Sequence, residues 1–218
     1  MKLKSLILIT ALLIGFSATA QNNNQDLSGN EVNVKLASKR ARPLAPDAMT
    51  REFLYSISPE NPLQLENPTI VTLNNDPSQL PDYGKRNMFL FYVDPESYVT
   101  ESANRALEKE LKADGAKLWE GRTYSPKIQG YAVLNLADTK LPPWLIRSVV
   151  KMVLGKHVPS LNFADNDHSL RNAWKLPDVN NKFVLMFIDK DCNLVFYRES
   201  PMSDEDKELM YQTIGKYR

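Results

Sequence analysis

The chain has 218 residues, a formal net charge of +1 and 24% charged residues, a globular composition that gives no global electrostatic case for nucleic-acid binding. Its single cysteine, Cys192, excludes an internal disulfide. It also excludes a dithiol–disulfide cycle within this chain, because a resolving thiol must come from another molecule.

Residues 1–20 have the parts of a secretory signal peptide. Lys2 and Lys4 precede an apolar run that is about half the ~20 residues a membrane span requires, and 18–20 read Ala-Thr-Ala, a small-residue cleavage site. No cysteine follows, which excludes lipid attachment at a new N-terminal cysteine. We expect cleavage after Ala20, an exported product that is periplasmic or secreted, and no stable membrane span.

Residues 21–47 are polar and show no sustained hydrophobic period, which predicts a flexible tail. The tail has a small cluster of cations, formed by Lys35, Lys39, Arg40 and Arg42. The cluster is a candidate for weak contact with an anionic surface, although a solvated linker is the favoured interpretation because four cations are few.

Residues 48–86 form a proline-rich extension, and proline at this density is typical of short edge strands or extended cover. Within it, residues 69–73 read Thr-Ile-Val-Thr-Leu and predict a strand. The Asn-Asn-Asp-Pro sequence at 74–77 predicts the turn that ends this strand.

The elements become sharper from residue 87. An unbroken apolar run predicts a strand buried on both faces at 88–93. The predicted elements that follow are a helix ending at 114–115, a strand at 130–136, a helix at 141–157, a strand at 159–164, a short helix from 167, a strand at 183–189, its hairpin partner at 194–197, and a last helix from 203. This order predicts a mixed sheet with helices on both faces.

The C-terminal half of the chain adds a residue pattern to this order of elements. The residues of the pattern are Leu170, Ala173, Trp174, Leu176, Leu185, Asp189, Lys190, Asp191, Val195 and Met202 to Glu205. Together, the order and the pattern resemble the thioredoxin superfamily over roughly residues 87–217, and most resemble the YtfJ-type periplasmic proteins of unassigned function. The resemblance implies an α/β thioredoxin-like three-layer sandwich with a mixed sheet at 87–218, preceded by the extension that covers it.

Two departures from the superfamily pattern concern its chemistry. The redox cysteines belong on the loop after the first core strand, where residues 96–99 read Glu-Ser-Tyr-Val. A cis-proline belongs just before the strand at 183–189, where residues 179–182 contain no proline and a cis bond would cost about 2.5–4 kcal/mol. We therefore expect a sandwich that lacks the redox cysteine pair and the cis-proline, with no thiol-disulfide oxidoreductase or peroxidase activity.

The loop after the first core strand is nevertheless the best candidate site, together with the loop expected to face it. The candidate ligand- or partner-binding residues are Asp94, Glu96, Ser97, Tyr98, Asn181 and Lys182. The alternative is that the acids only cap the following helix. The leading function is a non-redox binding module in the cell envelope that takes an envelope protein or a small ligand. The other hypotheses are a carboxylate-based enzyme at this loop, and a monothiol redox sensor through Cys192.

Other polar residues predict no metal site and no cofactor. Asp189, Asp191 and Asn193 copy the start of a calcium loop but lack its later glycine and glutamate, and are interpreted as a hairpin turn in which Asn193 takes the left-handed conformation. His157 and His168 have no cysteine partner, and are expected to be polar residues at helix ends.

Two further patterns have a functional and a structural interpretation. A Ser97–His168–Asp94 hydrolase triad lacks the Gly-x-Ser-x-Gly elbow that would support it. The helix around 143–155 has Arg147 and Lys151 one turn apart on a wide apolar arc, a pattern that suits a membrane surface or a partner. Packing of this helix against the sheet is the favoured expectation.

Overall fold

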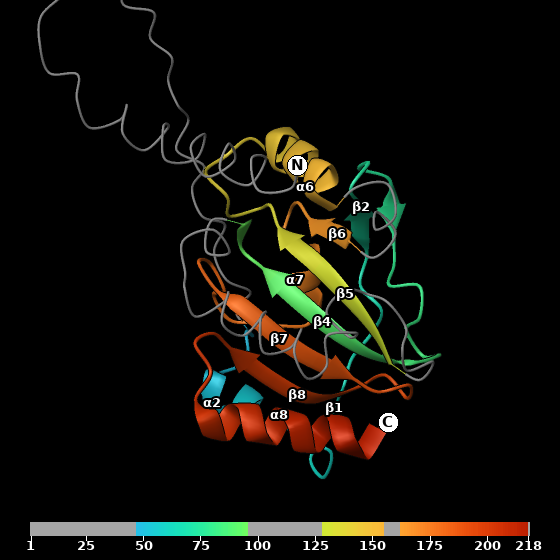
Figure 1. Ribbon diagram of the computed structural model, residues 1–218, viewed down its shortest axis with the longest axis vertical. Helices are drawn as coiled ribbons and strands as arrows, with labels where there is room; N and C mark the ends of the chain where they lie inside the picture. Colours follow the sequence, from blue (N-terminus) through green and yellow to red (C-terminus); the bar gives the residue numbers. More distant parts are fainter. Residues whose placement is uncertain (1–46, 96–127, 155–161, 218) are drawn as a thin grey trace, which may run out of the picture. The chain divides into compact units, whose positions relative to one another are not determined.

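The computed structural model describes residues 47–95, 128–154 and 162–217. In these ranges the strands form an eight-stranded sheet in the order β1-β8-β7-β4-β5-β6-β2-β3 (Figure 1). The strands are β1 (Leu63–Gln64), β2 (Ile70–Thr72), β3 (Pro77–Ser78), β4 (Asn87–Val93), β5 (Ile128–Asn135), β6 (Asn162–Asp165), β7 (Phe183–Ile188) and β8 (Asn193–Glu199). The helices are α2 (Arg51–Tyr55), α6 (Pro143–Leu154), α7 (Ser169–Ala173) and α8 (Asp204–Tyr217). Strands β4, β5 and β6 are parallel to one another, whereas β7 runs antiparallel to both of its neighbours, β4 and β8, so the sheet is mixed.

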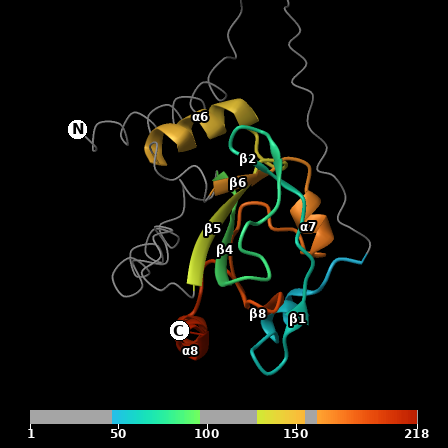
Figure 2. The same cartoon turned by 90° about the vertical axis from the view of Figure 1, so that its right-hand side faces the viewer.

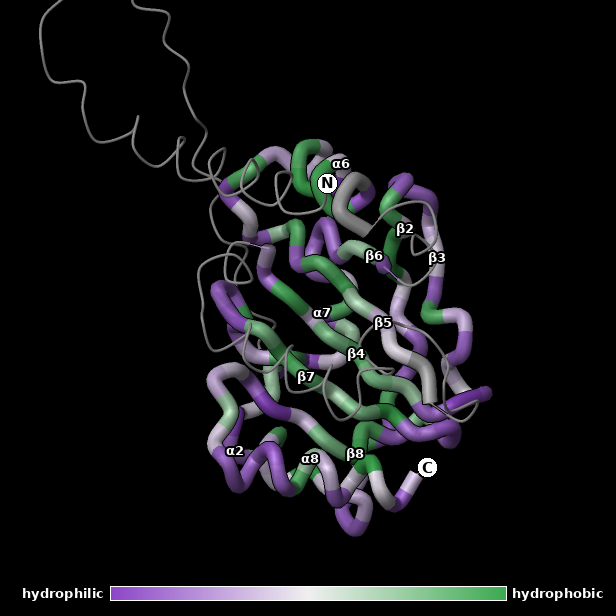
Figure 3. The backbone as a smooth tube through the Cα atoms, viewed as in Figure 1, coloured by the Kyte–Doolittle hydropathy of each residue, from purple (hydrophilic) through white to green (hydrophobic). Residues whose placement is uncertain are grey.

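The centre of the sheet is apolar on both faces, as the unbroken run in β4 predicts. All residues of β4 and β7 are buried, and these two strands stand out as hydrophobic in Figure 3. Because side chains alternate along a strand, Leu90 and Tyr92 join one core cluster while Phe89 and Phe91 join another.

The helices cover both faces of the sheet (Figure 2). Helices α2 and α7 pack on the Tyr92 face, through Leu54 and Leu170. Helix α8 packs on the opposite face, and α6 covers that same face further along through Ile146. The predicted three-layer sandwich with a mixed sheet is confirmed. The only cis peptide bond of the described residues is Ser200–Pro201, so the bonds at 178–183 are trans as expected.

The proline-rich segment supplies the strands at both edges of the sheet. Strand β1 pairs with β8 at one edge, while β2 pairs with β6 and β3 lies outermost at the other. Proline is tolerated at such an edge because its missing N–H faces away from the ladder, as at Pro77 in β3. The segment also contributes fully buried core residues, namely Leu54, Ile57, Ile70 and Leu80.

The later elements follow the predicted order with shifted bounds, and β5 and β6 each end one residue from the predicted position. The signal peptide, the tail with its cations, the helix after Pro95 and His157 lie outside the described residues. Within the described ranges, the helices are too short or too polar to cross a bilayer.

Candidate functional site

The parallel strands bring their carboxyl ends to one edge of the sheet. Val93 is in register with Leu134, and Asn135 is in register with Asp165, so Asp94, Asn135 and Asp165 follow one another across β4, β5 and β6. In open α/β sheets, ligands bind beyond the carboxyl ends of the strands. The amino end of β7 and the carboxyl end of β8 reach the same edge, because Val93 pairs with Phe183 and Val184 pairs with Glu199.

Asp94 joins the end of β4 to the loop before β7. Its side chain Oδ2 accepts a hydrogen bond from the backbone N–H of Asn181 at 3.0 Å. Its own backbone N–H donates to the carbonyl of Lys182 at 3.1 Å. The structure therefore brings together three of the predicted site residues, while Glu96, Ser97 and Tyr98 lie outside the described residues.

The loop that Asp94 contacts is a tight turn with exposed amide side chains. The N–H of Lys182 donates to the carbonyl of Val179 at 3.1 Å, and Asn181 has a φ of 56°. Asn180 and Asn181 are exposed, and the Lys182 side chain is 39% exposed. Asp94 is fully buried, so the groups this edge offers to a partner are two amides and an ammonium rather than the Asp94 carboxylate.

A buried carboxylate lies next to Lys182 at the end of β8. Glu199 Oε1 accepts hydrogen bonds from Arg51 Nε at 2.9 Å and from the Tyr197 hydroxyl at 3.0 Å, and Glu199 Oε2 lies 4.0 Å from Lys182 Nζ. Burial raises the pKa of Tyr197, and the nearby Glu199 charge raises it further. These contacts hold helix α2 against β8, so we interpret them as stabilising the fold and not as part of a binding site.

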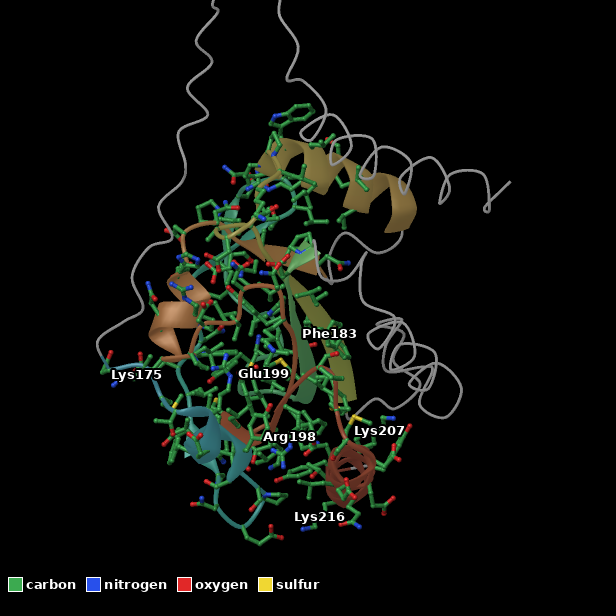
Figure 4. All side chains as sticks on the ribbon, turned by 90° about the vertical axis from the view of Figure 1, so that its left-hand side faces the viewer. Lys175, Phe183, Arg198, Glu199, Lys207 and Lys216 are labelled. Atoms are coloured by element: carbon green, nitrogen blue, oxygen red, sulfur yellow. The ribbon has the colours of Figure 1, made fainter. Side chains whose placement is uncertain are left out.

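The neighbouring Arg198 connects helix α2 to helix α8 (Figure 4). Its guanidinium donates to the Tyr55 carbonyl at 3.0 Å, pairs with Asp206 of α8, and lies 4.7 Å from the centre of the Tyr55 ring. Sequence reasoning gave no role to Arg198 or Tyr55, because these two residues are 143 positions apart along the chain.

A second polar cluster lies at the ends of β5 and β6, under α7. The Asp138 carboxylate contacts His168 Nε2 at 2.7 Å, accepts from Asn135 Nδ2 at 2.8 Å, and lies 3.5 Å from Arg171 Nη1. Burial disfavours the charged carboxylate, but the hydrogen bonds from His168 and Asn135 and the Arg171 charge outweigh it and lower the pKa of Asp138. Asp138 is thereby favoured as an ion inside the fold.

His168 lies at the start of α7, as expected from the sequence, but its burial was not predicted. It precedes α7 with a φ of 66°, but it is 1% exposed and its side chain makes no capping hydrogen bond. Its Nε2 contacts Asp138 and not Asp94, so these two members of the disfavoured Ser97–His168–Asp94 triad are not paired, and Ser97 lies outside the described residues. The physical reason is the fold, which places the loop after β5 between His168 and the end of β4.

Asp165 extends this polar cluster to the centre of the sheet. Its carboxylate accepts hydrogen bonds from the Tyr92 hydroxyl at 3.0 Å, the Ser169 hydroxyl at 3.2 Å and the Arg171 N–H at 3.2 Å. Burial strongly raises the pKa of Tyr92, and the Asp165 charge adds to this effect. The run of polar residues at 165–169, directly after a predicted strand and close to Arg171, is the sequence signal that could have revealed the cluster.

Cys192 lies at the opposite end of the sheet, in the turn between β7 and β8. Its N–H donates to the Asp189 carbonyl at 3.1 Å, and its own carbonyl accepts the N–H of Leu65 at 3.0 Å. Burial raises the pKa of the thiol, and the charges of Asp189 and Asp191 raise it further. A protonated thiol at this end of the sheet is poorly suited to act as a nucleophile.

The turn itself corrects one expectation and supports another. Cys192, with a φ of 68°, takes the left-handed conformation predicted for Asn193, because Asn193 is already the first residue of β8. Asp189 Oδ1 accepts the N–H groups of Asp191 and Asn193, each at 2.9 Å, which is the arrangement of a hairpin turn. In the described ranges, no group of three or more His, Cys, Asp or Glu residues is placed to hold a metal ion.

Comparison with known proteins gives no family assignment, since no protein-family model and no curated protein matches the chain. Among solved structures, the chain is similar to the exposed lipoprotein thioredoxin Etrx1 of Streptococcus pneumoniae, at 13% identity and a TM-score of 0.47, over 69% of this chain and 99% of that one. It is also similar to a candidate thiol:disulfide interchange protein DsbE of Chlorobium tepidum, at 13% identity and a TM-score of 0.49, over 71% of this chain and 94% of that one.

Proposed function

We propose that this chain is an exported, non-redox thioredoxin-like protein that binds an envelope protein or a small ligand through the loop at residues 178–182. The supporting observation is that the thiol and the candidate binding loop lie at opposite ends of the sheet. The only sulfur nucleophile of the chain, Cys192, lies in the β7–β8 turn. The exposed loop held by Asp94 lies at the other end of these strands, where the thioredoxin fold places its reactive group.

The loop has the properties of a preorganised contact surface. Its left-handed residue, Asn181, is fixed by the buried Asp94 carboxylate, so little further ordering is needed when a partner binds. The exposed Asn180 and Asn181 and the partly exposed Lys182 can donate and accept hydrogen bonds. A carboxylate-based enzyme is less favoured, because Asp94 is buried and already bonded to this loop.

Export and a closer family relationship belong to the same proposal. The signal-like residues 1–20 support export, and the pattern from Leu170 to Glu205 supports a relationship to YtfJ-type proteins. The cations of the tail would add a weak contact with anionic envelope polymers. A monothiol sensor through Cys192 is less favoured, because its thiol pKa is raised.

Capture from an envelope extract tests the binding proposal. The immobilised mature chain is compared with the double variant Asn180→Ala/Lys182→Ala and with a matched control, Lys190→Ala/Asp191→Ala, whose exposed side chains lie in the β7–β8 turn. We expect the first variant to lose the captured protein or ligand and the control to retain it. Equal capture by all three proteins would refute the loop as the binding surface. Insulin reduction above background by the wild-type chain would refute the non-redox assignment.

A further inference from the structure

Arg171 is a buried arginine of α7 whose guanidinium is only partly used. The residue is 3% exposed, and its Nη1 lies 3.5 Å from Asp138 Oδ2. Among the residues that the structure describes, its Nε and Nη2 atoms have no hydrogen-bond partner. Buried donors without partners are costly, particularly on a charged group, so these two atoms call for an acceptor.

The geometry of guanidinium defines that acceptor. The group is planar, and its Nε–H and one Nη2–H point side by side along one edge, which matches the two oxygens of a carboxylate. Because Nη1 is the atom turned toward Asp138, the Nε/Nη2 edge lies on a different side of the guanidinium from that carboxylate. An anion on this edge therefore does not compete with Asp138 for the same donor atom.

Two other side chains around Asp138 also keep a polar atom without a partner. His168 uses Nε2 for Asp138 and leaves Nδ1 unpaired, and Asn135 uses Nδ2 and leaves Oδ1 unpaired, in each case relative to the described part of the chain. His168 is 1% exposed and Asn135 is fully buried. Three buried residues on one carboxylate thus retain unused hydrogen-bonding capacity.

We propose that the Nε/Nη2 edge of Arg171 is a binding site for a small monocarboxylate. The near-complete burial of Arg171 favours a small ligand over a flat protein surface. The Asp138 carboxylate lies 3.5 Å from the guanidinium Nη1, and the Asp165 carboxylate accepts the backbone N–H of the same residue. With two carboxylates this near, a single negative charge is tolerated better than the double charge of a phosphate. This inference does not depend on the loop at 178–182 and concerns other residues.

Nitrogen-15 NMR of the arginine Nε–H groups in the full mature chain tests the proposal directly. Formate or acetate is titrated at constant ionic strength, with chloride and the neutral acetamide as comparison solutes. We expect a saturable shift of the Arg171 Nε–H resonance with the carboxylates alone. No saturable shift in the folded protein, or an equal shift with chloride or acetamide, would overturn the proposal.

Substitution assigns the resonance and removes the site. Bound carboxylate should also raise the Tm of the wild-type chain. Arg171→Lys keeps the positive charge but lacks the paired donors, so this variant should lose both the Arg171 resonance and the rise in Tm with carboxylate. Arg147→Lys, in α6, is the matched control and should retain both. A folded Arg171→Lys variant that keeps the rise in Tm contradicts the proposal, and if that variant does not fold, the wild-type titration decides.

The carboxylate can come from a free acid or from the end of a peptide, and a size series separates these sources. Acetate is compared with N-acetylglycine, which mimics a peptide C-terminus. Because Arg171 is so deeply buried, we expect acetate to give the larger saturable shift at equal concentration. The reverse order would overturn the assignment to a small free acid.

Discussion

The carboxylate of Asp94 accepts the backbone N–H of Asn181 at 3.0 Å, and this hydrogen bond fixes the exposed loop before β7 to the buried end of β4. Asn181 has a φ of 56°, in the left-handed region that residues other than glycine rarely adopt. Asparagine is among the residues that tolerate this region best. The loop conformation therefore depends on both the acceptor and the residue type.

Substitution of Asp94 by alanine should destabilise the fold, because the Asn181 N–H loses its acceptor. The expected loss is about 1–3 kcal/mol in the free energy of unfolding, measured by urea denaturation. Asn181→Gly should change stability by less than about 1 kcal/mol because glycine adopts positive φ freely, whereas the β-branched side chain in Asn181→Val should cost more. Equal stability of the glycine and valine variants would contradict this account of the loop.

The start of α8 is stabilised by a reciprocal pair of hydrogen bonds. The Ser203 hydroxyl accepts the Asp206 N–H at 3.1 Å, and the Asp206 carboxylate accepts the Ser203 N–H at 3.2 Å and pairs with Arg198. We expect Ser203→Ala to cost about 0.5–2 kcal/mol in thermal unfolding, and Asp206→Ala to cost more because it also leaves Arg198 without its carboxylate. The exposed Glu205→Ala serves as control, and a Glu205→Ala loss as large as that of Ser203→Ala would count against the cap.

The elements that sequence reasoning placed well are those with local signals. Residues 88–93 and 183–189 are apolar runs that a buried strand requires, and the structure has β4 at 87–93 and β7 at 183–188. The acids at 204–206 favour a helix N-terminus, and α8 begins at Asp204. Each signal is contained within a few neighbouring residues and needs no knowledge of the fold.

The contacts that sequence reasoning missed depend on chain topology. Arg51 and Glu199 are 148 residues apart, and Asp138 and His168 are 30 apart, so only the assembled sheet brings them together. The left-handed position of the β7–β8 turn was also predicted one residue too late, at Asn193 in place of Cys192. The reason is that the start of β8 at Asn193 depends on its pairing with β7 and β1. Asp94 and the facing loop were predicted, but the burial of Asp94 could not be.

The raised pKa of Cys192 predicts a thiol that reacts slowly with alkylating reagents. Burial and the charges of Asp189 and Asp191 disfavour the thiolate, which is the reactive form. At about pH 7.5 the native chain should react with iodoacetamide more slowly than free cysteine, whose pKa is about 8.5, and unfolding in urea should remove the difference. Mass spectrometry measures the modified fraction. If native Cys192 reacts faster than free cysteine, the hypothesis of a monothiol redox sensor is favoured again.

The proline-rich segment should be required for folding. Leu54, Ile57, Ile70 and Leu80 are each at most 1% exposed, and loss of each buried side chain typically costs about 2–5 kcal/mol, against a total stability of about 5–15 kcal/mol. A chain that begins at Asn87 should therefore lack a cooperative thermal transition and bind the dye ANS, whereas one that begins at Leu44 should unfold cooperatively. Cooperative unfolding of the shorter chain would show that residues 87–218 suffice.

The buried carboxylate of Asp138 should make the protein sensitive to acid. Its folded-state pKa lies below the ordinary value of 3.8, so its contribution to stability is present above that value and is lost as the pH falls through the lower, folded-state pKa. Asp138→Asn should cost about 3–5 kcal/mol at about pH 7, because it breaks the buried contact with His168 and Arg171. It should also flatten the fall in unfolding free energy between about pH 5 and pH 2, measured by urea denaturation. Asp191→Asn, whose side chain is 67% exposed, should leave that fall almost unchanged. Of these two carboxylates only Asp138 has buried hydrogen-bond partners, so an equal effect of the two substitutions would mean that the acid sensitivity arises elsewhere.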